Sequence, residues 1–488
     1  MKKLKISISY PPLESPKGTP LLSQNRQFQW FSDPTYIYPM IPASAATLLA
    51  ANGYEIFWDD AIAEGLSYKE WLERIIKEKP DIIVFETKTP VVKRHWKIIN
   101  DLRSCYELRV TSFVLCGDHV TALPEESMKN SKVDFVISGG DYDFILLSIA
   151  NKLSGRGELE GGVYFREGDK IIDSGKYDLS KHSLDELPQI DRELTKWKLY
   201  AHKNGNYKYT PGSYAMNARD CWWGKCAFCS WTTMFPGEKF RARSVQKALD
   251  EIGALVNLGV KEVMEDSGTL PVGDWLESFC EGMIERGYSK KIKISCNMRL
   301  NAIKDIEIWK LMKKAGFRMI LFGLESANQE TLDKINKGLQ VEEIEPSLKM
   351  CKSAGLEPHI TVMVGYPRET KENIQKTLGF AKRLFRKGYV DTLQATLAIP
   401  YPGTPLYKYC QENNFLLTED YDRFDQREPV MKTEIPAEEL KKMIGKLYRS
   451  FITPKFIWNK IKNIRSWQDA KFIFRAAGKV FGHLADFS

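Results

Sequence analysis

Three cysteines lie within nine residues in the stretch RDCWWGKCAFCSW, which covers residues 219–231. They are Cys221, Cys226 and Cys229, and the other six cysteines are scattered over a chain of 488 residues. A loop this short can turn all three sulfurs toward one point, which predicts a bound metal or iron–sulfur cluster. A structural zinc site needs a fourth ligand, and no further Cys or His stands at a familiar ligand spacing. An iron–sulfur cluster usually also takes four cysteines, so three would leave one iron open to a ligand that is not protein.

This stretch resembles the cluster loop of the radical S-adenosylmethionine (SAM) enzymes, including the aromatic Phe228 just before the last cysteine. The resemblance implies a 4Fe–4S cluster on Cys221, Cys226 and Cys229, with the amino and carboxylate groups of SAM on the open iron. The usual spacing in that family is C-x3-C-x2-C, whereas this chain reads C-x4-C-x2-C. Zinc, or a structural group of reduced thiols, is the alternative.

A repeating strand–helix rhythm surrounds the cysteine loop and predicts a partial (β/α)6 barrel of the radical SAM type over residues 206–430. The predicted strands are 213–219, 261–267, 292–299, 318–326, 359–367 and 392–400. Barrel enzymes keep their chemistry at the carboxyl ends of such strands. The residues at these ends to which the resemblance assigns SAM contacts are Glu265, Ser267, Arg299, Glu325, Ser326 and Gly365. Each also has a plain structural interpretation, such as a helix cap, a salt bridge or a turn.

Apolar, β-branched runs alternate with helical patterns over residues 1–150, which predicts a Rossmann-like, doubly wound parallel sheet. Such sheets bind ligands outside the carboxyl ends of their strands. The layout, with CGDHVTALPEE at 116–126, resembles the cobalamin-binding domain that precedes many radical SAM domains. The residues assigned to cobalamin on this basis are Tyr10, Asp59, Glu86, Gly117, Ser138 and Gly139. The histidine motif D-x-H-x-x-G is absent, which argues against a histidine ligand to cobalt, and a scaffold without cobalamin is the alternative.

The net charge of +8 is concentrated at the end of the chain. Residues 441–488 hold eleven Lys or Arg against two acidic residues, so the remaining chain is close to neutral. This balance argues against a nucleic-acid-binding protein. Residues 431–488 are predicted to be basic helices, which could lie on an anionic membrane surface or cover the open side of the barrel. Residues 151–205 are predicted to be a linker with a small hairpin.

Cysteine usage and the chain start indicate the compartment. Nine cysteines, an odd number, suggest a reducing cytoplasm rather than a disulfide framework. The first residues, MKKLKISISYPP, are predicted to form a strand rather than a secretion signal. The sequence has no run of about eighteen apolar residues, so no membrane-spanning helix is predicted.

The resemblance implies an enzyme that reductively cleaves SAM to a deoxyadenosyl radical and modifies an unactivated carbon. With cobalamin, the favoured reaction is C-methylation of a small-molecule or lipid-like substrate, with electrons from a donor such as flavodoxin or ferredoxin. Without cobalamin, the same radical could drive cyclisation, coupling or rearrangement. A non-catalytic iron–sulfur protein, which would cleave no SAM, is the alternative from another class.

Overall fold

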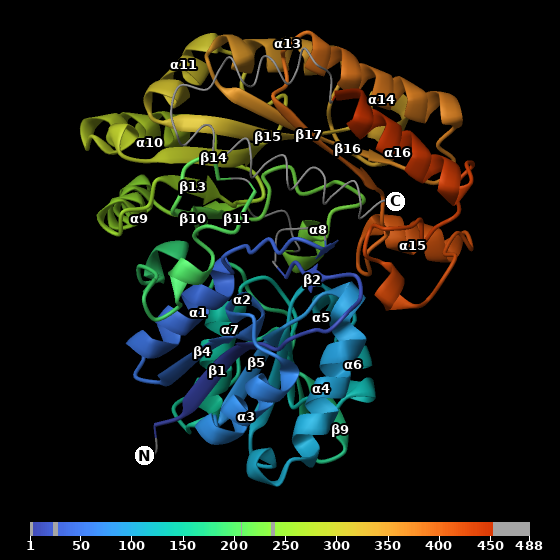
Figure 1. The fold of residues 1–488 in the computed structure, drawn as a ribbon. Coiled ribbons are helices and arrows are strands. Elements are labelled where there is room, and N and C mark those ends of the chain that lie inside the picture. Colours follow the sequence, from blue (N-terminus) through green and yellow to red (C-terminus); the bar gives the residue numbers. More distant parts are fainter. Residues whose placement is uncertain (1–2, 23–27, 206, 236–239, 452–488) are drawn as a thin grey trace.

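The computed structural model describes residues 3–22, 28–205, 207–235 and 240–451. Two sheets follow one another along the chain and form the cores of two α/β domains, with helix α8 (Trp231–Met234) lying between them (Figure 1). Within the described ranges, no helix combines the length and the apolar content that a bilayer crossing requires. The basic stretch after residue 451, for which membrane contact is one interpretation, lies outside the described residues.

The first sheet has seven strands in the order β4-β1-β5-β6-β7-β8-β9. The first five in this order run parallel, and the last two form an antiparallel hairpin that pairs with β7. The strands are β1 (Lys5–Tyr10), β4 (Glu55–Asp60), β5 (Ile82–Glu86), β6 (Ser112–Cys116), β7 (Phe135–Ile137), β8 (Val163–Glu167) and β9 (Lys170–Asp173). The strand order reverses between β1 and β5, which is the switch point where doubly wound sheets bind ligands.

Helices cover both faces of this sheet, as the alternation of apolar runs and helical patterns predicts. They are α1 (Met40–Ala51), α2 (Ala61–Glu64), α3 (Tyr68–Glu78), α4 (Val92–Ser104), α5 (Asp118–Ala122), α6 (Pro124–Asn130) and α7 (Tyr142–Leu153). A capping box between Ser67 and Glu70 fixes the start of α3 because each side chain satisfies a backbone N–H of the other. The short strands β2 (Thr19–Pro20) and β3 (Trp30–Phe31) form a separate ribbon.

The second sheet confirms the predicted partial barrel. Its six parallel strands stand in chain order, β10-β13-β14-β15-β16-β17. They are β10 (Gly212–Ala215), β13 (Glu262–Glu265), β14 (Lys293–Met298), β15 (Phe317–Glu325), β16 (Glu357–Val364) and β17 (Thr392–Leu397). The helices around them are α9 (Val245–Asn257), α10 (Asp274–Glu285), α11 (Ile306–Lys314), α12 (Gln329–Lys334), α13 (Val341–Ser353), α14 (Lys371–Arg386), α15 (Pro405–Glu412) and α16 (Ala437–Phe451).

The strand predicted over 213–219 is interrupted in the structure. The chain leaves the sheet after β10, and a second short strand, β11 (Ala218–Arg219), pairs antiparallel with β12 (Arg241–Ala242). Asn217 causes the break, because its backbone N–H and its side-chain amide both donate to the Glu265 carboxylate, at 3.0 and 2.7 Å. The cysteine loop therefore starts from a ribbon beside the barrel rather than from the barrel strand itself.

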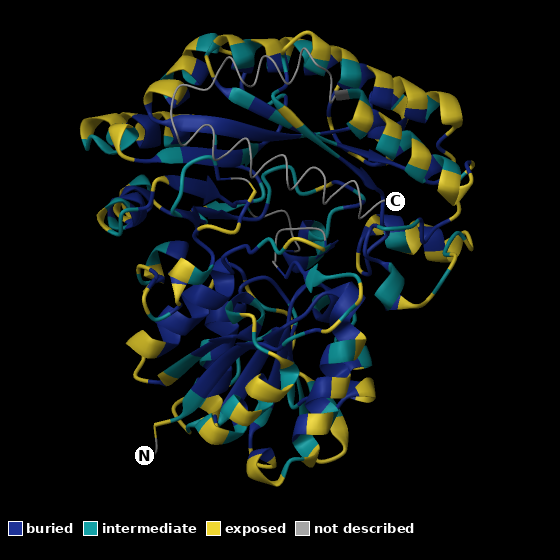
Figure 2. Ribbon diagram, viewed as in Figure 1, coloured by how far each residue is buried: buried dark blue, intermediate teal, exposed yellow. Residues whose placement is uncertain are grey.

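The central strands of both sheets are buried, while the outer helix faces and the β8–β9 hairpin carry exposed residues (Figure 2). One hydrophobic cluster runs from the N-terminal strands into the barrel, and it includes Trp231, Met234 and Phe235 of the segment between the two sheets. The domains therefore share a packed interface. This interface lies beside the cysteine loop.

Candidate cofactor site

The cysteine loop runs from β11 to α8 and lies partly buried beside the barrel. Cys226 is buried, and Cys221 and Cys229 are half-buried. Cys226 and Cys229 contact a small apolar cluster that includes Phe228, Met363 and Tyr366. Burial raises the pKa of the Cys226 thiol and that of the Cys229 thiol. A thiolate in this place therefore needs a positive partner or a bound metal to be stable.

Two neighbouring segments hold the loop in place through backbone hydrogen bonds. Ala227 donates its N–H to the Ile335 carbonyl and accepts from the Leu406 N–H, both at 2.8 Å. The Trp223 indole donates to the Asn336 carbonyl at 2.8 Å. A Cβ on Gly338, whose φ is +60°, would lie 2.2 Å from the Trp223 ring. The turn over residues 335–338 therefore fits closely against the loop.

Two cations and a carboxylate surround the cysteines. The Lys337 ammonium lies 2.8 Å from the Glu325 carboxylate, and both side chains are buried. Arg299 donates to the carbonyls of Lys337 and of Gly338, and its guanidinium lies 4.6 Å from the Trp223 ring. The strand-end pattern of the sequence predicted Glu325 and Arg299 in this region but not Lys337, which belongs to the turn after α12.

Unsatisfied polar atoms point to a missing ligand here. Within the described part of the chain, the buried Glu325 Oε2, Arg299 Nε and Tyr366 hydroxyl have no hydrogen-bond partner. Glu325 also has a positive φ of 61°, a strained backbone that is often found at functional sites. Buried polar groups in folded proteins normally have partners. A polar ligand beside the cysteines would supply them.

The other proposed SAM contacts have partners within the protein. Glu265 binds Asn217, and it shares a hydrogen bond with the Ser267 hydroxyl. Burial raises the pKa of Glu265 to about 7. The Ser326 hydroxyl forms a hydrogen bond with the Thr377 hydroxyl of α14, at 3.2 Å. These groups fix the strand ends around the loop.

The Gly365 turn is closed by Glu369, which the strand-end pattern did not predict. Gly365 donates its N–H to the Glu369 carboxylate at 2.8 Å, and Tyr366 donates to the same oxygen at 3.3 Å. The second oxygen of Glu369 is buried without a partner among the described residues, and burial raises the pKa of this carboxyl to about 7. The G-Y-P-R-E spacing, with an acid four residues after the glycine, could have indicated this closure.

The cysteines do not offer the convergent ligand set of a single ion. In the ranges that the structure describes, no three His, Cys, Asp or Glu side chains gather closely enough to hold one metal ion. Zinc takes four ligands at about 2.0–2.3 Å, so its ligands must converge on one point. A 4Fe–4S cluster is larger and takes one thiolate per iron. The three thiols of the loop would bind three of the four irons in such a cluster.

At the carboxyl edge of the first sheet, a buried carboxylate marks the switch point. Glu86 ends β5 and accepts hydrogen bonds from the Tyr10 hydroxyl at 2.6 Å and the Tyr142 hydroxyl at 2.9 Å. Burial raises the pKa of Glu86. Gly117 ends β6 with a φ of +125°, and a Cβ there would lie 2.1 Å from the Thr87 carbonyl oxygen. The edge is therefore closely packed around Glu86.

The remaining residues assigned to this edge differ in their surroundings. Asp59 is turned toward α3, where Arg74 pairs with it and the Trp71 indole donates to it at 2.7 Å. Ser138 and Gly139 contact α5, since the Gly139 N–H donates to the Thr121 hydroxyl at 3.1 Å. A Cβ on Gly139 would also lie 4.0 Å from the Met234 carbonyl oxygen, which places this turn at the domain interface, while Asp59 lies in an internal ion pair.

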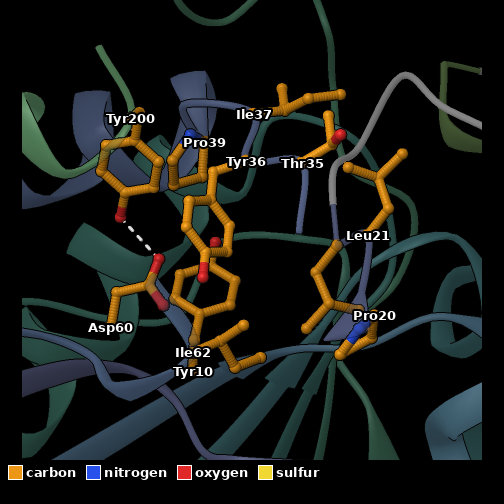
Figure 3. A pocket seen from close by; sticks show the side chains of 11 residues that line it. Tyr10, Pro20, Leu21, Thr35, Tyr36, Ile37, Pro39, Asp60, Ile62 and Tyr200 are labelled. Atoms are coloured by element: carbon orange, nitrogen blue, oxygen red, sulfur yellow. Dashed lines mark hydrogen bonds between the residues drawn. The ribbon is translucent and has the colours of Figure 1, made fainter. Parts of the chain in front are cut away.

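A small cavity opens beside Tyr10 at the same edge (Figure 3). Its volume is about 20 Å³, enough for roughly one water molecule. Its walls are mostly aromatic and apolar, and the Tyr200 hydroxyl donates to the Asp60 carboxylate at 2.6 Å on one side of it. Burial raises the pKa of Asp60 to about 6. The cavity marks a gap between the sheet and the loop that covers it.

Comparison with known families identifies the barrel. Residues 218–381 match the model of the Radical SAM superfamily, and this match includes all three cysteines of the loop. The barrel of this chain is therefore a radical SAM domain. As a radical SAM enzyme it uses a 4Fe–4S cluster and SAM, and the unsatisfied polar atoms beside its cysteines fit that pair of ligands.

Similar radical SAM proteins extend over most of the chain. An uncharacterized methyltransferase of Pyrococcus horikoshii is 28% identical over 409 residues, which cover 82% of this chain and 84% of the relative. The anaerobic magnesium-protoporphyrin IX monomethyl ester cyclase of Cereibacter sphaeroides is 26% identical over 439 residues, which cover 86% of this chain and 68% of the relative.

Solved structures share the two-domain fold. The cobalamin-dependent radical SAM enzyme OxsB, with aqua-cobalamin and SAM bound, superposes with a TM-score of 0.70 at 14% identity, over 99% of this chain and 72% of that chain. The radical SAM methyltransferase TsrM from Kitasatospora setae gives a TM-score of 0.64 at 16% identity, over 84% of this chain and 76% of that chain. The prediction of a Rossmann-like domain before a partial radical SAM barrel is therefore confirmed.

Proposed function

We propose that this radical SAM enzyme binds cobalamin between its two domains and methylates an unactivated carbon of a small-molecule substrate. The observation that carries the proposal is the contact between the cysteine loop and the carboxyl edge of the first sheet. The Gly140 N–H, just beyond β7, donates to the Met234 carbonyl of α8 at 2.7 Å. The two proposed cofactor-binding edges therefore lie next to each other, and methyltransferases are among the similar proteins, which supports the proposal.

When bound, the cluster, SAM and cobalamin together supply the radical and the methyl group, which amino-acid side chains cannot provide. The residues of this chain would bind, orient and shield these groups. Lys337 and Arg299 place positive charge beside the cysteine thiolates, and Glu325 holds the Lys337 ammonium in position. Phe228 and Tyr366 keep water from the loop because they pack around Cys226.

A second candidate is radical cyclisation. It is favoured by the match to the magnesium-protoporphyrin IX monomethyl ester cyclase, which covers 86% of this chain. The two reactions differ in their use of SAM, because methylation also leaves S-adenosylhomocysteine, whereas radical cleavage alone leaves deoxyadenosine. The products from SAM therefore discriminate between them.

The proposed setting is a reducing cytoplasm with a one-electron donor such as flavodoxin or ferredoxin. All nine cysteines are free of disulfides, which agrees with a reducing compartment. The electron donor would need to approach the half-buried part of the cysteine loop. Membrane contact through the basic end of the chain rests on sequence alone.

The test is anaerobic incubation of the reconstituted full chain with hydroxocobalamin, SAM, a reductant and extracts of candidate substrates, followed by mass spectrometry. Methylation predicts deoxyadenosine and S-adenosylhomocysteine together, with one methyl group added to a small molecule. Deoxyadenosine alone, with a cyclised product, would favour the second candidate. If a chain that holds its cluster forms neither deoxyadenosine nor S-adenosylhomocysteine, the result would contradict both candidate functions.

A further inference from the structure

A six-residue segment over 138–143, with the sequence SGGDYD, contacts both proposed cofactor regions. It leads from β7 into α7, at the carboxyl edge of the first sheet. Its Tyr142 hydroxyl donates to Glu86 at the switch point, at 2.9 Å. Asp141 and Asp143 contact the start of the cysteine loop, and Gly140 contacts its end.

Asp141 and Asp143 of this segment hold the start of the cysteine loop. Arg219, two residues before Cys221, donates from Nη1 to Asp141 at 2.8 Å and to Asp143 at 2.9 Å, and from Nη2 to the second oxygen of Asp143. Arg241 lies opposite Arg219 in the β11–β12 ribbon and donates to Asp141 at 2.6 Å. Two arginines thus face two buried aspartates. The paired contact of Arg219 with Asp143 fixes orientation as well as distance.

Gly140 holds the other end of the loop. Its N–H donates to the Met234 carbonyl at 2.7 Å, at the end of α8. A Cβ on this residue would lie 2.2 Å from the Phe235 ring, so a glycine is needed for the close approach. The segment therefore contacts the loop on both sides of the three cysteines, before Cys221 and after Cys229.

We infer that residues 138–143 couple the cobalamin region to the cluster loop, with Asp141, Asp143 and Gly140 as positioning residues. This inference rests on the proposed function, because it assumes cobalamin at the edge marked by Glu86. An ion group buried this deeply is often no more stabilising than apolar packing. What it supplies here is a fixed geometry between two regions that must act on one substrate.

The test is hydrogen exchange of the cluster-reconstituted full chain, followed over residues 219–235. Asp143→Asn removes the charge that Arg219 pairs with. The control is Glu262→Gln, which breaks a similarly buried pair with Arg318 at the amino end of β13, away from the loop. Without cobalamin, we expect exchange over 219–235 to rise at least about tenfold in Asp143→Asn and to stay unchanged in the control. Asp143→Glu should restore slow exchange.

Addition of hydroxocobalamin tests the coupling itself. It should slow exchange over 219–235 in the parent chain and in Glu262→Gln but not in Asp143→Asn. Equal exchange in Asp143→Asn and the control would overturn the inference. If Asp143→Asn does not fold, Gly140→Ala, which leaves the ion group intact, should raise exchange over 231–235, and unchanged exchange there would also overturn it. If the parent chain binds no hydroxocobalamin, the cobalamin proposal fails separately, and the exchange without cobalamin still decides the positioning role.

Discussion

At the scale of single residues, nearby charge distinguishes the loop cysteines from the packing cysteines of the barrel. Cys280, Cys296 and Cys351 are fully buried, as expected for packing residues, whereas the loop cysteines lie at the edge of a small apolar cluster. The charges of Lys337 and Glu325 act on Cys226 of the loop. This environment can stabilise thiolates once a cluster binds, because the nearby ammonium offsets part of their charge.

We expect Cys226→Ala to lose the cluster and all SAM cleavage, while the chain still folds. The removed sulfur is one of the three proposed ligands, and no other cysteine stands close enough in sequence to replace it. Cys280→Ala is the matched control, because it removes a buried thiol within α10. Iron analysis and deoxyadenosine formation after anaerobic reconstitution measure both. Full iron content in Cys226→Ala would remove this residue from the ligand set.

Glu265 gives the apoprotein a predictable pH dependence. Burial raises its pKa to about 7 from an ordinary value of 4.5, so the folded chain binds a proton that the unfolded chain releases between these values. The proton on Glu265 adds about 3 kcal/mol to the free energy of unfolding. This stabilisation is fully present below about pH 4.5 and is lost as the pH rises to about 7.

Glu265→Gln should remove this dependence. The free energy of unfolding of the variant minus that of the parent should be more positive at pH 8 than at pH 5. The reason is that only the parent loses the stabilisation by the buried proton as the pH rises. Urea unfolding of the metal-free chain at both values measures the difference. An equal offset between parent and variant at the two pH values would show that Glu265 ionises near its ordinary pKa.

The residue patterns predicted the cysteine loop but not its charged neighbours. Three thiols at this spacing have few structural uses, so their chemistry is visible in the sequence. A lysine just after a helix is usually exposed, and nothing in the INKG pattern marks Lys337 as buried. Only the fold brings it to Glu325, 12 residues away along the chain.

At the scale of elements, the site depends on turns that fit against the cysteine loop. The barrel strands were predictable because buried parallel strands are continuous apolar runs. The break after β10 was not, because it arises when Asn217 binds a carboxylate of the neighbouring strand. The turn over 335–338 likewise takes its role from a tertiary contact with Trp223.

Gly338→Ala tests this turn. We expect lower iron content after reconstitution, because the new methyl group would overlap the Trp223 ring and displace the loop. Gly388→Ala is the matched control, since Gly388 also has a positive φ, of +75°, and faces open space. Both variants carry a backbone cost of about 1–2 kcal/mol. Similar iron content in the two variants would contradict the proposed fit.

At the scale of the whole molecule, residues far apart in sequence join the two domains. Lys17 pairs with the buried Asp425 at 2.5 Å, and the Gln29 amide donates to Gln426 at 2.7 Å. The predicted hairpin over residues 151–205 extends the first sheet through β8 and β9. Sequence periodicity could not predict the Lys17 and Gln29 contacts, because each joins segments about 400 residues apart.

Asp425→Asn should loosen this connection between the domains. Loss of a hydrogen bond to a charged group should lower the free energy of unfolding by about 1–3 kcal/mol. Asp101→Asn, which breaks an exposed pair with Lys97, should cost about 0.5 kcal/mol or less. Iron content should be unchanged in both, while hydroxocobalamin affinity should fall only in Asp425→Asn. Unchanged stability and affinity in Asp425→Asn would show that this pair does not hold the domains together.

The most direct test of the account is the cobalt and iron content of the full chain after anaerobic reconstitution with iron, sulfide and hydroxocobalamin. The account predicts about four irons and about one cobalt per chain, with iron lost and cobalt retained in Cys226→Ala. Iron without cobalt would leave a radical SAM enzyme whose first domain is a scaffold. Neither metal in a folded chain would contradict the account.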